Sequence, residues 1–263
     1  MLKDITIGQY IAGNSFIHKM DPRAKIFATV LFMAALFAAR GGQMYALVLG
    51  FTVFIILLSG IPVVFYLKGL KPLLIIIILT SVMHFFLTPG EEIWSWTVLV
   101  VTREGLWQGF FMGLRLALLV VMTSVLTLST TPIALTDGIE KILNPLKRVG
   151  VPAHELAMMM TIALRFIPTL IEETEKIMNA QKARGADFES GSLVKRAKAL
   201  IPILVPLFIS AFRRADDLAV AMEARCYRGG ENRTRLRELA YTGRDAAGLM
   251  ITLALLVVVF VMR

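Results

Sequence analysis

The residues best suited to chemistry in this sequence are two arginines and two groups of carboxylates. Arg184 and Arg225 each follow an alanine close to the end of a predicted helix. A guanidinium offers five fixed donors, so it is well suited to anchoring a protein contact. The carboxylates lie at Glu172, Glu173 and Glu175, and at Asp216 and Asp217. They are typical of a solvated or ion-paired helix face, with a Mg²⁺-diphosphate site as the alternative.

A third arginine and the histidines are weaker candidates for a functional site. Arg115 lies inside an apolar stretch, where an ionisable side chain is a functional candidate by default. It either lines a transport path or is held structurally by His84 or a backbone carbonyl. His154-Glu155 lacks the second histidine of a zinc-protease helix, and Cys226 is the single cysteine. No phosphate-binding G-x-x-x-x-G-K-[ST] loop occurs. We therefore predict no catalytic residue, no metal site and no ATP hydrolysis by this chain.

The composition excludes most soluble classes of protein. Hydrophobic residues make up 57% of the 263 residues and charged residues only 18%, while the net charge is +9. A soluble domain carries about 25% charged residues. These values exclude an ordinary soluble domain, a disordered tail and a nucleic-acid-binding module. In so apolar a chain, the basic excess indicates the cytoplasmic loops of a membrane protein.

Apolar stretches predict five membrane-spanning helices. A helix needs about 20 mostly apolar residues to cross a bilayer. The predicted spans are 24–40, 44–66, 72–88, 105–129 and 246–262. Before the first span, Asp21 is expected to be the N-cap and Pro22 to occupy the first helical turn.

The distribution of Lys and Arg orients these spans. With the N-terminus inside, 24 of the 28 Lys and Arg face the cytoplasm, 18 of them between residues 140 and 244. The positive-inside rule then places the N-terminus in the cytoplasm and the C-terminus outside. All three tryptophans, Trp94, Trp96 and Trp107, lie at the outer boundary, as an aromatic belt would.

The long segment before the last span predicts amphipathic helices on the cytoplasmic side. Pro132 and Pro152 suit the first turns of two helices. Arg165 and Pro168 interrupt one apolar run, and the other has only 14 uncharged residues, from 199 to 212. We therefore expect partial burial at the inner membrane face and not two further crossings.

The two long amphipathic helices end alike. An offset of 41 residues superposes Arg184 on Arg225. Because seven residues make almost two full helical turns, each arginine continues an apolar stripe. The stripes are Leu170 and Ile177 in the first helix, and Leu204, Ala211 and Leu218 in the second. One reading is a cation at a helix C-terminus, with Gly185 as an ordinary stop. The other is a stripe that enters a partner, with the guanidinium anchoring the contact.

At these residues the sequence resembles a known family. Paired Ala-Arg-Gly motifs at the ends of cytoplasmic helices are typical of EcfT, the transmembrane T component of energy-coupling factor (ECF) transporters. Here the motifs are Ala183-Arg184-Gly185 and Ala224-Arg225-Cys226, the second with cysteine in place of glycine. The resemblance extends over residues 10–25, 164–168 and 198–235, and is strongest to the shared (group II) T components.

The resemblance implies a scaffold without catalytic activity. Each motif would dock on one of two ABC-type ATPase subunits, which bind ATP and Mg, while this chain binds no cofactor. A substrate-binding S component would carry the vitamin. Either that component or the membrane spans would pack against the stripe residues Leu170, Ile177, Ala211 and Leu218. The remaining partner would be the lipid bilayer of a bacterial cell membrane, and no nucleic acid is expected.

The fold expected from these observations is an all-α integral membrane protein with long amphipathic coupling helices. Residues 1–129 would form a membrane domain of four spans, 130–245 a cytoplasmic coupling-helix domain, and 246–263 the last span. The leading hypothesis is the coupling subunit of an ATP-driven vitamin importer. The alternatives are a membrane enzyme of lipid or isoprenoid metabolism that uses the acidic clusters, and a secondary transporter with Arg115 in its path.

Overall fold

The computed structural model describes residues 10–96, 99–188, 192–229 and 239–263, with the backbone alone at 92–96, 99–100, 193 and 195–197. The described chain forms two compact units. One contains residues 139–188 and 192–229, and the other contains residues 10–138 and 239–263. The last predicted span therefore belongs to the same unit as the first four. The predicted domain limits at 129/130 and 245/246 stay a prediction.

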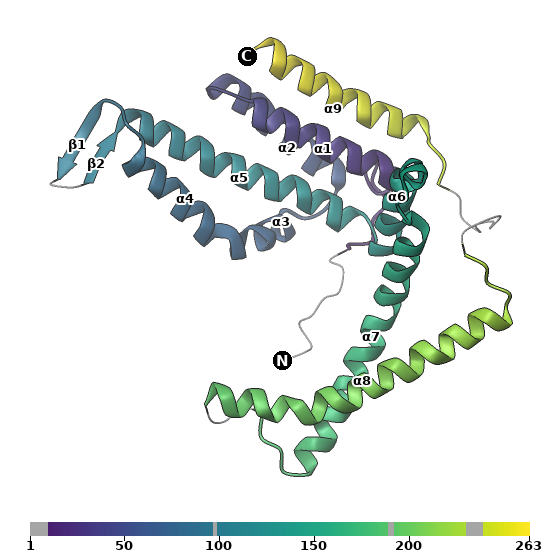
Figure 1. The fold of residues 1–263 in the computed structure, drawn as a ribbon. Coiled ribbons are helices and arrows are strands. Elements are labelled where there is room, and N and C mark those ends of the chain that lie inside the picture. The colour runs from purple at the N-terminus through teal and green to yellow at the C-terminus, as the bar shows by residue number, and fades with distance from the viewer. Residues whose placement is uncertain (1–9, 97–98, 189–191, 230–238) are drawn as a thin grey trace. The chain divides into compact units, whose positions relative to one another are not determined.

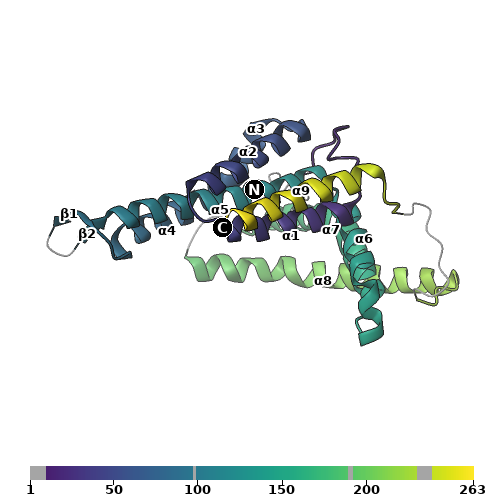
Figure 2. The same ribbon diagram turned by 90° about the horizontal axis from the view of Figure 1, so that it is seen from above.

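The second of these units is a membrane bundle around one apolar core. Its central helices are α1 (Pro22–Ala38), α2 (Gly42–Ser59), α5 (Arg103–Ser129) and α9 (Gly243–Val261). Helix α9 lies along α1, as Figures 1 and 2 both show. Phe32, Leu36, Val48, Leu128 and Val259 are almost fully buried between them. Asp21 caps α1 by accepting the Arg23 N–H at 2.9 Å, which confirms the predicted N-cap.

A second layer of this unit is a long helical hairpin. Its elements are α3 (Val63–Leu70), η1 (Lys71–Leu73), α4 (Leu74–Leu87), and the strands β1 (Glu92–Trp96) and β2 (Leu99–Thr102), which lead into α5. Helix α4 packs along α5 (Figure 1) yet buries none of its own residues. Small residues on α5 allow this close approach, at Gly105, Gly109 and Gly113. Such a stripe is a common way for membrane helices to pack where lipid gives no hydrophobic drive.

Substitution of Gly109 by alanine is expected to loosen the α4–α5 hairpin. An added Cβ would lie 2.6 Å from the Ser81 carbonyl oxygen and would overlap the Phe85 ring. Overpacking of this kind costs about 1–3 kcal/mol. The matched control is Gly50→Ala in α2, where an added Cβ meets nothing within 4 Å. Thermal unfolding in detergent should show a lower midpoint for Gly109→Ala alone, and equal midpoints for both variants would contradict the close packing.

The other unit contains the helices predicted for the cytoplasmic segment. Helix α6 (Pro132–Leu143) starts in the membrane bundle and leads into η2 (Asn144–Val149), α7 (Ala153–Ala183) and α8 (Leu193–Ala224). Pro132 is the first residue of α6, as predicted, whereas Pro152 is the N-cap of α7 and precedes its first turn. Helices α7 and α8 are 31 and 32 residues long and cross each other (Figure 1).

Five helices in the described chain are long and apolar enough to cross a membrane, though they are not the predicted five. They are Gly42–Ser59, Val63–Leu87, Arg103–Ser129, Ala153–Ala183 and Gly243–Val261. Helix α1, the predicted first span, has 17 residues and reaches only the lower end of the usual range. Helix α7 meets the length and composition limits despite Arg165 and Pro168, with the lowest mean hydropathy of the five, 1.3.

Two predicted boundaries were wrong. The second span was predicted to continue to residue 66, but α2 ends at Ser59. Gly60 adopts a left-handed conformation with φ 65°, and Pro62 then starts a new helix as its N-cap. The third helix accordingly begins at Val63, before its kink at Pro72, and not at residue 72. The β1–β2 hairpin was not predicted at all.

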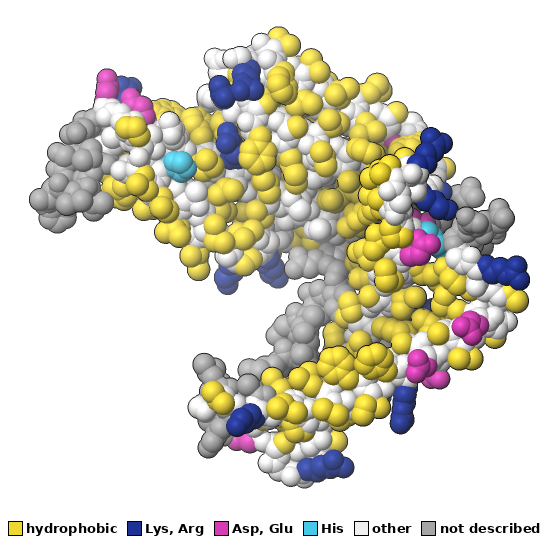
Figure 3. All heavy atoms as spheres, in the orientation of Figure 1, with side chains coloured by type: hydrophobic (Ala, Val, Ile, Leu, Met, Phe, Trp, Pro, Cys, Tyr) yellow, Lys and Arg dark blue, Asp and Glu magenta, His cyan; other side chains and the backbone are white. Residues whose placement is uncertain are grey.

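The architecture is that of an all-α, multi-pass membrane protein, as predicted. Apart from the short β1–β2 hairpin, every regular element in the described ranges is helical. Hydrophobic side chains cover most of the face seen in Figure 3, and few charges interrupt them over α4 and α5. Exposed apolar residues on this scale are expected where the surroundings are lipid tails or other membrane helices.

Candidate partner-binding site

Helix α7 ends in a complete Schellman turn around the first arginine. Arg184 is the C-cap residue, and Gly185 follows it with φ 88°. The Gly185 N–H donates to the Lys182 carbonyl at 3.0 Å, and the Ala186 N–H donates to the Gln181 carbonyl at 3.0 Å. These two bonds satisfy carbonyls that the helix end would otherwise leave open. The backbone therefore ends sharply at the arginine.

Helix α8 ends in the same turn around the second arginine. The Cys226 N–H donates to the Glu223 carbonyl at 2.8 Å, and the Tyr227 N–H donates to the Met222 carbonyl at 3.0 Å. Cys226 takes the left-handed position with φ 55°, as the only described residue other than glycine at positive φ. That conformation costs an L-residue about 1–2 kcal/mol. Cysteine in place of glycine therefore adds backbone strain at this helix end but leaves the geometry of the turn unchanged.

Both predicted motifs lie on the surface. Ala183, Arg184 and Gly185 are exposed. Ala224, Arg225 and Cys226 are exposed in the same way. In the described part of the chain, neither guanidinium forms a recorded ion pair. Two free cations at matching helix ends could each take a carboxylate or a set of backbone carbonyls from another protein.

An ion pair joins the two helices where they cross. Arg214 Nη2 on α8 lies 2.9 Å from Glu173 Oε2 on α7. Glu173 precedes Arg184 by 11 residues, and Arg214 precedes Arg225 by 11 residues. At 1.5 Å per residue, each arginine is about 16 Å along its helix from the pair. The helix segments that lead from the ion pair to Arg184 and to Arg225 are therefore equal in length.

The predicted apolar stripes are only partly open to a partner. Leu170, Ile177, Ala211 and Leu218 are all half-buried. Leu218 lines a groove between α7 and α8, opposite Ile162 and Phe166. The apolar face of each helix is therefore partly covered by the other helix.

A neighbouring flank of α8 is much more exposed. Ile201, Val205, Phe208 and Phe212 recur at helical spacing with exposed fractions of 54, 55, 60 and 68%. Figure 3 shows hydrophobic side chains in a band along this helix. The predicted stripe, in phase with Arg225, was not distinguished from this flank by the sequence pattern. The apolar face of α8 is wider than one packed helix can cover, and this width in the sequence could have indicated an exposed flank.

The acidic clusters do not converge on a site. Glu173 is paired with Arg214, whereas Glu172, Asp216 and Asp217 are exposed. No group of three or more His, Cys, Asp or Glu side chains that could hold a metal occurs in the described ranges. His154 Nδ1 lies 3.0 Å from Glu140 Oε1, so that imidazole has a partner within its own unit.

A buried polar network ties the start of α9 to the start of α1. Asp245 is fully buried, and its carboxylate accepts from the Asp21 N–H and from the N–H and hydroxyl of Thr242, each at 2.7 Å. Asp21 in turn accepts two bonds from the Arg23 guanidinium, at 2.9 and 3.1 Å. Arg23 also donates to the Leu239 carbonyl at 3.1 Å. Asp21 and Arg23 therefore hold the start of α1 against the start of α9.

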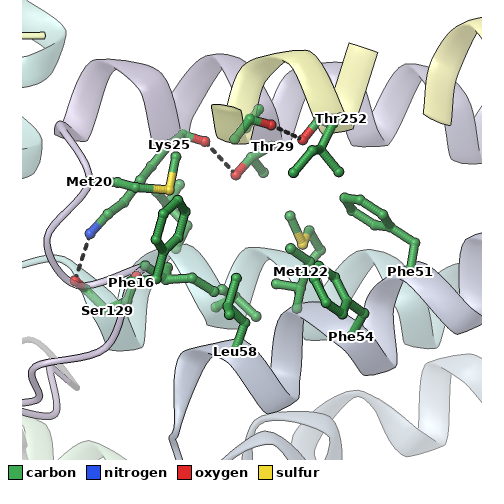
Figure 4. Close-up of a pocket in the computed structure, with 17 residues that line it drawn as sticks. Phe16, Met20, Lys25, Thr29, Phe51, Phe54, Leu58, Met122, Ser129 and Thr252 are labelled. Carbon is green, nitrogen blue, oxygen red and sulfur yellow. Dashed lines mark hydrogen bonds between the residues drawn. The ribbon is translucent and has the colours of Figure 1, made fainter. Parts of the chain in front are cut away.

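Lys25, two residues after Arg23, lines a small apolar cavity (Figure 4). Lys25 Nζ donates to the Ser129 carbonyl at 2.9 Å and to Thr130 Oγ1 at 3.0 Å. Its ammonium thus turns away from the cavity of about 60 Å³ that Phe51, Met122 and their neighbours line. Lys25 thus connects the start of α1 to the end of α5.

Arg115 caps the end of another helix. Its Nη2 donates to the carbonyl of Ala39, the C-cap residue of α1, at 3.4 Å. The rings of Phe37 and Tyr45 lie 5.7 and 5.8 Å from the guanidinium carbon. A cation at the negative end of a helix dipole is favourable. Of the two expected partners, the backbone carbonyl and not His84 is the one found.

The chain is similar to known proteins over most of its length. The family described as CbiQ, cobalt transport protein, matches residues 13–236. A relative from Acidaminococcus fermentans is 57% identical over 263 residues, covering 100% of this chain and 98% of its own. It is named energy-coupling factor transporter transmembrane protein EcfT. The chain belongs to the EcfT family.

Other EcfT proteins are similarly close. The EcfT of Thermosediminibacter oceani is 60% identical over 251 residues, with 95% of each chain covered. The EcfT of Bacillus subtilis is 48% identical over 264 residues and covers both chains fully. The resemblance found in the sequence is thus confirmed, and the protein is a transmembrane component of an energy-coupling factor transporter.

Proposed function

We propose that this EcfT protein is the non-catalytic coupling subunit of an ATP-driven vitamin or micronutrient importer. Arg184 and Arg225 would each dock on one of two cytoplasmic ABC-type ATPase subunits, which bind the ATP and Mg. The observation that carries the proposal is the pair of identical Schellman turns, each presenting an exposed arginine about 16 Å from one crossing point. Two equal sites on one scaffold suit two related partners.

The charge distribution supports the orientation of this subunit. Most Lys and Arg lie between residues 140 and 244, and the positive-inside rule places that region in the cytoplasm. The N-terminus is then inside and the C-terminus outside. Helix α7 would remain at the inner face of the bacterial cell membrane, because a crossing would bury Arg165, which lies exposed halfway along it.

The direct test of this function is assembly. A tagged copy of the chain, expressed with the ATPases and an S component, should capture both ATPases and the S component from detergent extracts. The isolated chain should hydrolyse no ATP, whereas the assembled complex should. Capture of no ATPase by the wild-type chain would overturn the proposal.

A substitution on the exposed flank of α8 separates S-component binding from ATPase binding. Phe208→Asp should reduce S-component recovery at least about tenfold, because truncating an aromatic anchor costs about 2 kcal/mol and a charge adds desolvation. ATPase recovery should not change. The comparison is Leu218→Asp, at a half-buried position of the predicted stripe, which should instead weaken the packing of α7 on α8. Full S-component recovery with Phe208→Asp would exclude this flank as the contact.

A further inference from the structure

A polar cluster holds the residue that follows the second arginine motif. The Tyr227 hydroxyl lies 3.3 Å from His154 Nε2 and 2.8 Å from Met158 Sδ, both near the start of α7. On its other side, His154 Nδ1 lies 3.0 Å from Glu140 Oε1 on α6. One imidazole thus connects α6, α7 and the chain just after α8.

The chemistry of the three groups fixes how they bond. A carboxylate is an acceptor, so His154 Nδ1 carries a proton and donates it to Glu140. In the neutral imidazole, Nε2 is then an acceptor, and the single proton of the Tyr227 hydroxyl is shared between Nε2 and Met158 Sδ, both of which accept. The side chains of His154 and Glu140 are only 22 and 13% exposed, which shields both bonds from competing water. Partly buried bonds to a charged group contribute more than exposed ones.

The backbone of Tyr227 transmits this restraint to Arg225. Tyr227 is the residue whose N–H closes the Schellman turn on the Met222 carbonyl. Its ring also lines the apolar groove between α7 and α8, with Phe166 and Leu218. The ring is therefore held along its side by apolar contacts and at its tip by the imidazole. Because Tyr227 follows Arg225 by two residues within a closed turn, fixing the ring also fixes the helix end.

The first helix end, at Arg184, has no equivalent of the Tyr227 side chain. The residue equivalent to Tyr227 under the 41-residue offset is Ala186, which closes the turn of α7 in the same way. A methyl group has no hydroxyl to donate and no ring to fill a groove. The backbones of the two ends match, but the position that holds Tyr227 at the second end holds an alanine at the first.

We propose that Tyr227, held by His154 and Glu140, is a positioning residue that fixes Arg225 relative to α6 and α7. The two arginine ends are then unequal in how they are restrained, although they are equal in backbone shape. This inference rests on the proposed function only in taking Arg225 as the contact with an ATPase. The restraint itself is a property of this chain alone.

The single cysteine allows the restraint to be measured directly. Cys226 is exposed and lies between Arg225 and Tyr227, so a nitroxide attached there reports the motion of this end. The full chain is labelled and placed in lipid nanodiscs without partners. Removing one hydroxyl, in Tyr227→Phe, should shorten the rotational correlation time of the label about twofold. The first end, labelled through Ala186→Cys in a Cys226→Ser background, should keep its correlation time when Tyr227→Phe is added.

Variants of His154 distinguish positioning from bulk packing. His154→Gln keeps one donor for Glu140 and one acceptor for Tyr227, and should retain the slow motion of the wild type. His154→Leu fills similar space without either bond and should resemble Tyr227→Phe. In the assembled complex, Tyr227→Phe and His154→Leu should weaken ATPase binding at the second end several-fold, and His154→Gln should restore it.

The outcomes separate this inference from the proposed function. Label motion that is the same in wild type, Tyr227→Phe and His154→Leu would overturn the positioning role, even if both ATPases are captured. Faster motion in these two variants, with His154→Gln like wild type, would support it. If the wild-type chain captured no ATPase, the proposed function would fail, while faster label motion would still establish the restraint.

Discussion

Reversing both motif charges, with Arg184→Glu and Arg225→Glu together, is expected to abolish capture of the two ATPases. Both guanidiniums are exposed C-cap groups with no recorded ion pair in the described structure, so each is available to a partner. Loss of an interfacial arginine typically costs about 2 kcal/mol or more, which corresponds to roughly a 30-fold loss of affinity for each contact. A carboxylate there also faces the negative end of the helix dipole.

The control for this pair has the same change in net charge elsewhere on the same helices. Arg165→Glu with Arg213→Glu alters one exposed arginine on α7 and one on α8, each away from the helix ends. This variant should capture both ATPases as the wild type does. Pull-down recovery and vitamin uptake by cells are the measurements. Wild-type recovery and uptake in the Arg184/Arg225 variant would remove the docking role from these arginines.

Replacing Asp245 by alanine is expected to be the most destabilising change in the membrane bundle. The carboxylate accepts three hydrogen bonds of 2.7 Å and has no exposed surface. Its removal leaves the buried N–H donor of Asp21 without its acceptor, at about 1–3 kcal/mol. It also breaks the capping box of α9. A total near 3 kcal/mol corresponds to a fall of roughly 6–12 °C in Tm.

The neighbouring Arg244 provides the matched control. It lies in the same turn of α9 and is exposed, so Arg244→Ala should leave Tm within about 2 °C of the wild type. Thermal unfolding of purified protein in detergent measures both variants. If Asp245→Ala unfolded at the wild-type temperature, the contact between the starts of α1 and α9 would not hold the bundle together.

Patterns that act along the chain were readable from the sequence. Apolar length predicted the helices at 105–129 and 246–262, and Asp21-Pro22 predicted the start of α1. The 41-residue offset predicted two equivalent helix ends, because a repeated phase leaves the same residue at the same place on each helix. The turn at Gly185 follows from glycine's tolerance of positive φ.

Contacts between elements distant in sequence could not be predicted from the sequence. No local pattern shows that Glu173 pairs with Arg214, or that Tyr227 reaches His154 across 73 residues. The same holds for Lys25, which bonds the Ser129 carbonyl and Thr130 Oγ1. For Arg115 a backbone carbonyl was one of the expected partners, but no pattern indicated that it is the carbonyl of Ala39. The end of α2 was missed for another reason. Gly60 and Pro62 are tolerated in many membrane helices, so their effect here depends on packing.

The unequal lengths of α1 and α5 have a consequence for the surrounding lipid. Seventeen residues of α1 extend about 26 Å, whereas the 27 residues of α5 extend about 40 Å. A hydrocarbon core of about 30 Å cannot match both lengths at once. A helix longer than the hydrocarbon core is accommodated by tilting or by local thickening of the bilayer, and a shorter one by local thinning. Reconstitution in lipids of different chain length is therefore expected to change the tilt of α5 more than that of α1.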